Sequence, residues 1–525
     1  MGIFTLDCTL RDGGYVNNWN FREKHIMSIL ENLTIANIDF VECGYLNQNA
    51  IFNSDKTVYQ NLTDIQKLLP VERGNTKYVC MINYGEYDSS KIPYCDGKSV
   101  VGFRVVFHKK DWKDALDFCA QIQDKGYLIF VQPMMTVSYS DKELLVLLEG
   151  VNHLNPFACY IVDSFGVMKR SDLLRLSYLF DFNLNKEIVM GYHAHNNLQL
   201  AFSNAQSFVE INTKRDRLID SSVYGIGRGA GNLNTELFIQ FLNDINDSNY
   251  KINPLLKIID ESISTIYQEN YWGYSMPHYL SAVYYCHPNY ASYLAQKNTL
   301  TVDGLKNIIS SISEEKKNTF DKKYIEKMYI NYQRSFQYDE STADELALMF
   351  NQKKILLVGP GKSSIKYSTN ITEYLEKNKP IIISVNHNSK LIKSDYLFYS
   401  NRKRYENAKT EELNCNIITT SNISRKRGYT VDYESLLKKD DEMIADNALI
   451  MALNLLIKLG VTEVDLIGFD GYSYNHNDNF VDIELSLPMD KRTIEQLNYK
   501  INCELAEISK ILEVNFITPS AYQKI

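Results

Sequence analysis

The sequence predicts an α/β protein in two parts, an N-terminal (β/α)8 TIM barrel with a helical extension and a C-terminal Rossmann-like α/β domain. Two observations support this fold class. Through the first ~235 residues, eight short apolar runs alternate with amphipathic stretches, and eight strands alternating with helices make a TIM barrel. A new strand–turn–helix pattern then begins at residue 353. We expect the barrel over 1–240, the extension and linker over 241–345, and the second domain over 350–525.

The expected barrel strands are rich in β-branched residues and apolar on both faces, as suits strands buried in a parallel sheet. In chain order they are IFTLDCT (3–9), DFVECG (39–44), KYVCMIN (77–83), VVGFRVVF (100–107), YLIFVQPM (127–134), CYIVDS (159–164), IVMGYHAH (188–195) and RLIDSSVYGI (217–226). Stretches of helical periodicity separate most of them, so the expected barrel is parallel and has its helices outside.

Beyond the barrel, helical periodicity dominates residues 240–345, where an aromatic cluster (271–294) suits helices packed on the barrel. The polar stretch 331–345 is typical of a linker. Strands of the second domain are expected within 353–364, 380–386, 396–400, 416–421 and 463–471.

The composition excludes several classes of protein. A chain that is 45% hydrophobic and 23% charged, with a net charge of −8, is typical of a soluble globular protein that does not primarily bind nucleic acid. It has no secretory leader and no apolar run of ~18 residues, so no membrane span is expected. Nine cysteines without a C-x-x-C pair favour reduced thiols and a cytoplasmic location.

The segment GYHAHNN (191–197) places two of only nine histidines one residue apart, at the end of the seventh expected strand. Residues two apart in a strand point to the same face, so His193 and His195 would direct both imidazoles at one metal ion. Arg11 and Asp12 end the first expected strand, and barrel enzymes place their chemistry at this end of the strands. Asp12 would add a carboxylate ligand. A chance pair of loop histidines is the alternative interpretation.

Three separated motifs, TLRDGG, HAHNN and GIGRGAGN, resemble in this order those of the DRE-TIM metallolyases, an HMG-CoA lyase-like superfamily. The resemblance covers roughly residues 1–290, and the 4-hydroxy-2-oxovalerate aldolase branch is the nearest match. It implies a divalent metal, Mn²⁺ or Mg²⁺, held by Asp12, His193, His195 and Asn232. It also implies that Arg11 stabilises an enolate oxygen.

Polar residues near other expected strand ends, and one tyrosine after the barrel, complete the expected site. We assign Glu42 to the catalytic group and Arg104, Gln132, Asp163 and Tyr274 to substrate binding, with Asp220 as a candidate to orient an imidazole. For each of these the competing interpretation is structural: a salt bridge for Arg104, and packing for the others.

One position departs from the aldolase branch. Its members carry an acid/base histidine three residues after the metal-binding aspartate, and this chain has Tyr15 there. We expect Tyr15 to transfer the proton. Tyr271, Tyr274 and His278 are further candidates, with packing as the alternative.

In the second domain, LLVGPGKSS does not match the P-loop, because Leu356 stands where that motif needs a glycine. The segments SVNHNS, DYLFYSNRKRY and LIGFDG loosely resemble sialyltransferase-like and DUF115 proteins, which bind nucleotides or sugar nucleotides. The resemblance implies that Gly359, Gly361, Ser363 and Asn386 lie near a nucleotide. A non-catalytic interaction domain is the alternative.

These motifs together predict a carbon–carbon lyase, a class II aldolase that acts through the enolate of a 2-oxo acid such as pyruvate and an aldehyde. A nucleotide or nucleotide-sugar partner for the second domain would place it in modified-sugar or surface-glycan biosynthesis. The alternatives are a Claisen-type acyl-CoA lyase or synthase on the same barrel, and a non-catalytic binding protein. Barrel precedent also suggests a homodimer.

Overall fold

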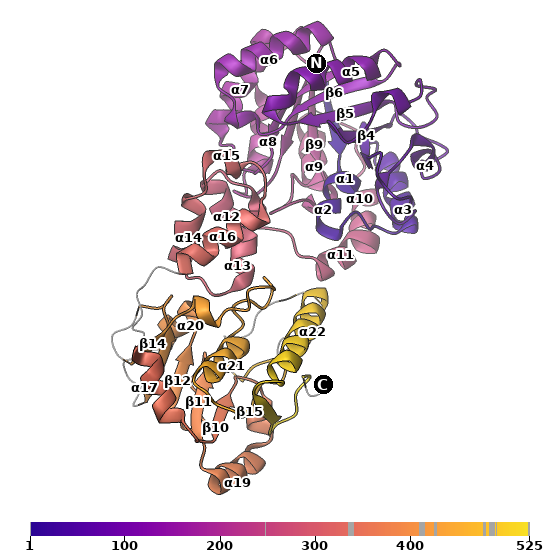
Figure 1. The fold of residues 1–525 in the computed structure, drawn as a ribbon. Helices are drawn as coiled ribbons and strands as arrows, with labels where there is room; N and C mark the ends of the chain where they lie inside the picture. The colour runs from indigo at the N-terminus through magenta and orange to yellow at the C-terminus, as the bar shows by residue number, and fades with distance from the viewer. Residues whose placement is uncertain are drawn as a thin grey trace. The chain divides into compact units, whose positions relative to one another are not determined.

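The structure is a computed structural model that describes residues 2–246, 248–333, 341–408, 415–424, 428–475, 479–481, 489 and 491–522. The chain divides into two compact units, Met1–Ala291 and Ser292–Ile525 (Figure 1). The boundary falls inside the range 241–345 that the sequence pattern assigns to an extension and linker, so the helices of this range are divided between the units. Residues 334–340 of the expected linker lie outside the described residues.

The first unit contains a closed parallel barrel, which confirms the predicted fold class. The sheet closes because β1 pairs with both β2 and β9, and the short β3 is attached to β2 beside the barrel. The strands are β1 (Ile3–Asp7), β2 (Phe40–Leu46), β3 (Val58–Tyr59), β4 (Lys77–Asn83), β5 (Gly102–Phe107), β6 (Leu128–Pro133), β7 (Ala158–Asp163), β8 (Val189–Ala194) and β9 (Arg217–Ser221).

Helices surround this barrel and continue after its last strand (Figure 1). Those between the strands are α1 (Thr9–Asp12), α2 (Gly14–Asn17), α3 (Glu23–Ile35), α4 (Leu62–Gln66), α5 (Trp112–Gln123), α6 (Asp141–Leu154), α7 (Arg170–Asn183) and α8 (Ala201–Glu210). After β9 follow α9 (Thr235–Asn246), α10 (Asn253–Ile258), α11 (Ser264–Glu269), α12 (Met276–Val283) and α13 (Pro288–Lys297). Their apolar faces bury residues against the outside of the strands, as α5 does with Leu116 and Ile122.

The barrel interior changes from apolar to polar toward the carboxyl ends of the strands. Phe40, Phe130 and Leu218 belong to an inner apolar cluster. The residue two positions further along each of these strands is polar and buried: Glu42, Gln132 and Asp220. Because residues two apart in a strand share a face, these polar side chains lie above the apolar layer, where TIM barrels hold their active sites.

The second unit contains a parallel sheet with the strand order β14-β13-β12-β11-β10-β15-β16. Its strands are β10 (Ile355–Val358), β11 (Ile381–Val385), β12 (Tyr396–Tyr399), β13 (Asn416–Thr420), β14 (Tyr429–Val431), β15 (Glu463–Ile467) and β16 (Glu513–Phe516). The chain runs outward from β10 to β14 and then resumes at β15 on the other side of β10. The topological switch point therefore lies at the carboxyl ends of β10 and β15.

Helices cover both faces of this second sheet. Side chains of α17, α21 and α22 share one apolar core with the sheet, and α19 contributes to a second core on the opposite face. The helices are α14 (Val302–Ser310), α15 (Glu314–Lys317), α16 (Lys322–Gln333), α17 (Ser341–Phe350), α18 (Ser363–Lys366), α19 (Ser368–Asn378), α20 (Arg402–Asn407), α21 (Ala448–Lys458) and α22 (Lys491–Ile508). The predicted second α/β domain is thus confirmed. No described helix is long and apolar enough to cross a membrane.

Candidate active site

Three buried side chains, Asp12, His193 and His195, converge at the mouth of the barrel. One ligand atom from each lies within 4.8 Å of the others. The Nε2 atoms of His193 and His195 are 3.8 and 3.6 Å from Oδ2 of Asp12. The expectation that the first strand carries Asp12 is corrected, because β1 ends at Asp7 and the helical turn α1 presents Asp12.

The protonation states of this cluster suit a metal ion. Burial lowers the pKa of His195 to about 3, so its imidazole is neutral at physiological pH. Burial opposes ionisation of Asp12, but the surrounding positive charge, that of Arg11 above all, outweighs it and holds the pKa of this carboxyl well below its usual value. A carboxylate with two imidazole nitrogens is a common ligand set for a divalent cation.

Asn232 offers the cluster a fourth candidate ligand atom, its side-chain oxygen. Its Nδ2 donates to Oδ2 of Asp12 at 2.6 Å and to the carbonyl of Ile226 at 3.1 Å, whereas its buried Oδ1 has no hydrogen-bond partner among the described residues. An unpartnered buried amide oxygen is costly, and a cation would satisfy it. The residues present therefore fit the divalent metal implied by the sequence.

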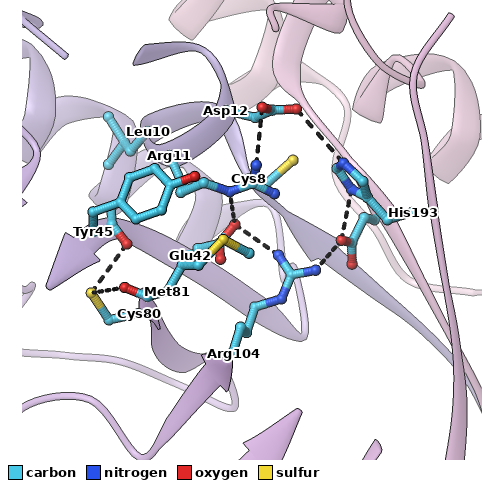
Figure 2. A network of polar contacts seen from close by, with 12 residues as sticks. Cys8, Leu10, Arg11, Asp12, Glu42, Tyr45, Cys80, Met81, Arg104 and His193 are labelled. Carbon is cyan, nitrogen blue, oxygen red and sulfur yellow. Dashed lines mark hydrogen bonds and ion pairs between the residues drawn. The ribbon is translucent and has the colours of Figure 1, made fainter. Parts of the chain in front are cut away.

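A buried ionic network supports this cluster from below (Figure 2). Nε of Arg11 donates to Oε2 of Glu42 at 2.8 Å, and Nη1 of Arg104 donates to the same oxygen at 2.7 Å. Nη2 of Arg104 pairs with Asp220, which in turn lies 2.9 Å from Nδ1 of His193. Because Asp220 engages Nδ1, the Nε2 atom of His193 is left to face Asp12.

The sequence assigned Arg104 and Gln132 to substrate binding. The structure places both side chains inside this buried network. Arg104 is fully buried, and with the Gln132 amide turned so that its oxygen accepts, that oxygen lies 2.8 Å from Nη2 and 3.2 Å from Nε of Arg104. All three guanidinium nitrogens of Arg104 then have protein partners. The structure therefore supports the salt-bridge alternative for this arginine.

Asp163 and Tyr274, which the sequence assigned to substrate binding, lie in two different settings. The carboxylate of Asp163 accepts the backbone N–H groups of Val167 and Met168, each at 2.9 Å, and so holds the loop that follows β7. Tyr274 lies between α11 and α12 and is 54% exposed. No hydrogen bond among the described residues joins Tyr274 to Asp12, His193 or His195.

Tyr15 lies on α2 at the rim of the site. Its hydroxyl is 3.0 Å from the hydroxyl of Tyr45, and its ring packs against Trp19. Tyr15 is 41% exposed, whereas Tyr45 is buried and its pKa is raised by burial. The hydrogen bond to Tyr45 thus fixes the position of the Tyr15 hydroxyl on a partly exposed side chain.

The motif GIGRGAGN forms the loop after β9, and Asn197 holds it in place. Oδ1 of the buried Asn197 accepts the backbone N–H of Ala230 at 2.8 Å. Gly229 has φ of +69°, and a Cβ there would lie 2.7 Å from Oδ1 of Asn197, so the close approach requires glycine. The loop presents Arg228, which the sequence assignment missed although it is the only charged residue of the motif.

In the second unit, the glycine turn after β10 contacts the turn after β15. A Cβ on Gly359 would lie 2.5 Å from the carbonyl oxygen of Gly468, and one on Gly361 would lie 2.5 Å from the same atom. The backbone N–H of Ser363 donates to Asp470 at 2.8 Å, and its hydroxyl also bonds to Asp470. A carboxylate of the chain itself therefore occupies the place where the sequence suggested a phosphate.

A cavity of about 750 Å³ opens at this switch point, entirely within the second unit. Its lining includes Gly361, Asn386, Asn401, Arg404, Asp470 and Lys500, but not Gly359 or Ser363. Oδ1 of Asn386 accepts the backbone N–H groups of Ser400 and Asn401, at 2.9 and 3.2 Å. Asn386 thus shapes the wall of the cavity by ordering the start of α20.

Comparison with known proteins finds sequences and structures similar to the first unit. Residues 3–260 match the family model described as HMGL-like. A 4-hydroxy-2-oxovalerate aldolase of Pseudoalteromonas translucida is 26% identical over 240 residues, which are 45% of this chain and 68% of the relative. One from Geobacillus thermodenitrificans is 22% identical over 270 residues, 51% of this chain and 77% of the relative. The crystal structure of the N-terminal domain of a candidate aldolase from Bacteroides vulgatus, 24% identical, aligns with a TM-score of 0.49 over 56% of this chain and 97% of that one.

Proposed function

Residues 3–260 are an HMGL-like domain, and on this premise we propose that the protein is a divalent-metal-dependent aldolase acting on a 2-oxo acid and an aldehyde. The observation that carries the proposal is the convergence of Asp12, His193 and His195 within 4.8 Å at the carboxyl end of the barrel. The names of the aldolase relatives support the same reaction class.

The proposed ligands are Asp12, His193, His195 and Oδ1 of Asn232, and the proposed metal is Mn²⁺ or Mg²⁺. A bound divalent cation would polarise the carbonyl of a 2-oxo acid such as pyruvate and stabilise the negative charge that develops on its oxygen. Because the imidazole of His195 is already neutral at physiological pH, this ligand need not lose a proton when the metal binds.

The chain's own residues have three roles in this proposal. Arg11 directs its guanidinium at the developing oxyanion, and its ion pairs with Glu42 and Asp12 fix its orientation. Tyr15 moves a proton between solvent and the reacting carbon or oxygen, with Tyr45 as its hydrogen-bonding partner. Glu42 thus acts by positioning Arg11 and does not itself carry the proton.

Proton exchange at the methyl group of pyruvate tests the proposal. In D₂O, protein supplied with Mn²⁺ or Mg²⁺ is expected to replace the methyl protons with deuterium, as followed by NMR, and to form an aldol product when an aldehyde is added. The H193A and D12N variants are expected to lose both activities. A wild-type protein that binds Mn²⁺ and exchanges no pyruvate protons would contradict the proposed reaction.

The competing Claisen-type reaction differs in its requirement for coenzyme A. Aldol formation from pyruvate and a free aldehyde, with no CoA ester present, would exclude the acyl-CoA lyase or synthase. Turnover that appears only with an acyl-CoA would instead favour it and contradict the aldolase.

For the second unit we propose a nucleotide or nucleotide-sugar site in the cavity at the switch point. Two features support this site: its position where doubly wound sheets bind ligands, and its lining by Arg404, Lys500 and Asn386. Joined to an aldolase, such a site suits the synthesis of modified sugars for surface glycans. Calorimetric titration with UDP, CMP and GDP, alone and as sugar conjugates, tests it, and no binding at millimolar concentration would contradict it.

A further inference from the structure

Three arginines belong to the barrel site, and two of them are neutralised by carboxylates. Arg11 pairs with Glu42 and Asp12, and Arg104 pairs with Glu42 and Asp220. Arg228 forms no ion pair with any carboxylate of the described residues. Among the described residues, its one hydrogen bond runs from Nη2 to the carbonyl oxygen of Ser164 at 3.0 Å.

The guanidinium of Arg228 is enclosed by aromatic rings and not by acids. Its central carbon lies 5.3 Å from the ring centroid of Tyr15 and 5.9 Å from that of Phe165. Its Nε is buried and has no hydrogen-bond partner among the described residues. Cation–π contacts of this kind contribute roughly 0.5–2 kcal/mol each, which does not replace the hydrogen bond that Nε lacks.

Arg228 lies on the loop that also contributes Asn232 to the cluster of Asp12, His193 and His195. Nδ2 of Asn232, four residues after Arg228, donates to Oδ2 of Asp12 at 2.6 Å. The guanidinium stacks over Tyr15, the residue proposed to transfer the proton. The loop that carries Arg228 is held by Asn197, two residues after the ligand His195, so the arginine and the ligand share one support.

We propose that Arg228 binds a carboxylate group of the substrate, and this rests on the proposed aldolase function. A guanidinium presents its donors in a planar fork that matches a carboxylate, and such charge-assisted pairs are stronger than neutral hydrogen bonds. Arg11 cannot supply the whole of this recognition, because two of its nitrogens are bonded to Glu42 and Asp12. The carboxylate belongs either to the 2-oxo acid or to an acidic aldehyde, and the experiment distinguishes them.

The test uses the full chain, loaded with Mn²⁺, as wild type, R228Q and R228K. Three quantities are measured: the affinity for oxalate by calorimetry, the KM and kcat of proton exchange at pyruvate, and the ratio of kcat/KM for succinic semialdehyde over butanal. The two aldehydes have the same number of carbons, and only the first carries an acid. R175Q is the matched control, since Arg175 pairs with Asp141 on the surface.

R228Q loses one charge-assisted pair, so we expect either its oxalate affinity or its preference for the acidic aldehyde to fall roughly 10-fold or more. R228K is expected to show a smaller decrease. Weaker oxalate binding with a raised KM for pyruvate would assign the contact to the 2-oxo acid. A lower ratio of semialdehyde to butanal, with oxalate binding unchanged, would assign it to the aldehyde.

Wild-type values of all three quantities in R228Q would overturn the proposal for Arg228 and leave the aldolase intact. If the wild type binds oxalate but exchanges no pyruvate protons, the proposed reaction fails, and the oxalate affinities still decide the role of Arg228. If the wild type binds neither oxalate nor pyruvate, both proposals fail. Equal Mn²⁺ affinity and equal circular dichroism of the variants would show that the mutations act on substrate and not on folding.

Discussion

Nδ1 of His193 lies 2.9 Å from Oδ2 of Asp220, and both side chains are buried. The contact fixes the imidazole so that Nε2 faces Asp12, and partners of this kind orient metal-binding histidines. Asp220 is itself held by Arg104, so the orientation of one candidate ligand depends on a chain of buried charges.

The D220N variant should therefore weaken metal binding. We expect Mn²⁺ affinity to fall by roughly 10- to 100-fold, as is typical when the partner of a ligating histidine is changed. Titration of free Mn²⁺ by electron paramagnetic resonance measures this. D141N is the control, because Asp141 lies on the surface in an ion pair with Arg175. Equal affinities in D220N and the wild type would mean that Asp220 does not orient the ligand.

Replacing Arg104 should destabilise the barrel more than it alters substrate binding. R104M leaves Glu42 and Asp220 buried without this cation, and an unpaired buried charge costs roughly 3–5 kcal/mol. We expect the first urea unfolding transition of the full chain to shift to lower urea, while R175M leaves it in place. An unchanged transition, combined with a raised KM for pyruvate, would return Arg104 to the substrate-binding role that the sequence suggested.

The depressed pKa of His195 makes the metal-free protein sensitive to acid. Burial lowers this pKa to about 3 in the folded protein, against about 6.5 for an exposed histidine. Between these values the unfolded chain binds a proton that the folded chain does not. The free energy of unfolding therefore decreases as the pH falls from about 6.5. Asp163, whose pKa burial raises to about 6, has the opposite effect.

Comparison with H195Q isolates the effect of His195, because Asp163 is present in both proteins. The free energy of unfolding of the metal-free wild type is expected to fall more steeply between pH 7 and pH 4.5 than that of H195Q. Chemical denaturation at several pH values gives both curves. Parallel curves would show that His195 takes up a proton in the folded state as readily as in the unfolded state.

The barrel and its metal cluster were predictable because they follow from local rules. Strand periodicity places His193 and His195 on one face, and the alternation of apolar and β-branched runs locates the strands to within a few residues. Asp12 lies beside the two histidines as predicted, but α1 and not the first strand presents it, since the chain turns into α1 two residues after β1. Nothing in IFTLDCTLRDGG marks where extended backbone becomes a helical turn.

The partners of buried charges were not predictable in the same way. Arg104 and Asp220 are 116 residues apart, and their contact depends on the register of strands around the barrel. Arg228 was not singled out because the glycines of its motif have an obvious conformational role and draw attention away from the motif's one charged residue. In the second unit, Gly359 and Gly361 allow two turns to touch, whereas the sequence had suggested that these glycines lie near a nucleotide.

Mutation of Tyr15 tests whether its hydroxyl transfers the proton. Its side chain is partly exposed, its hydroxyl is bonded to that of Tyr45 at 3.0 Å, and Arg228 stacks on its ring. The Y15F variant removes the hydroxyl but keeps the ring, so Mn²⁺ and oxalate should bind as they do to wild type. A proton-transferring group typically contributes 10²- to 10⁴-fold to a rate, and we expect kcat for pyruvate proton exchange to fall within that range.

Measurement of exchange by NMR across pH 6–9 separates proton transfer from substrate binding. If Tyr15 only packs against Arg228, Y15F, which keeps the ring, should leave both KM and kcat near their wild-type values. If it transfers the proton, kcat should fall and KM should stay near the wild-type value. Y94F serves as the control, because Tyr94 is 76% exposed and belongs to no part of the proposed site. A Y15F variant with wild-type kcat would direct the search for the proton carrier to His278, whose buried Nδ1 has no hydrogen-bond partner among the described residues.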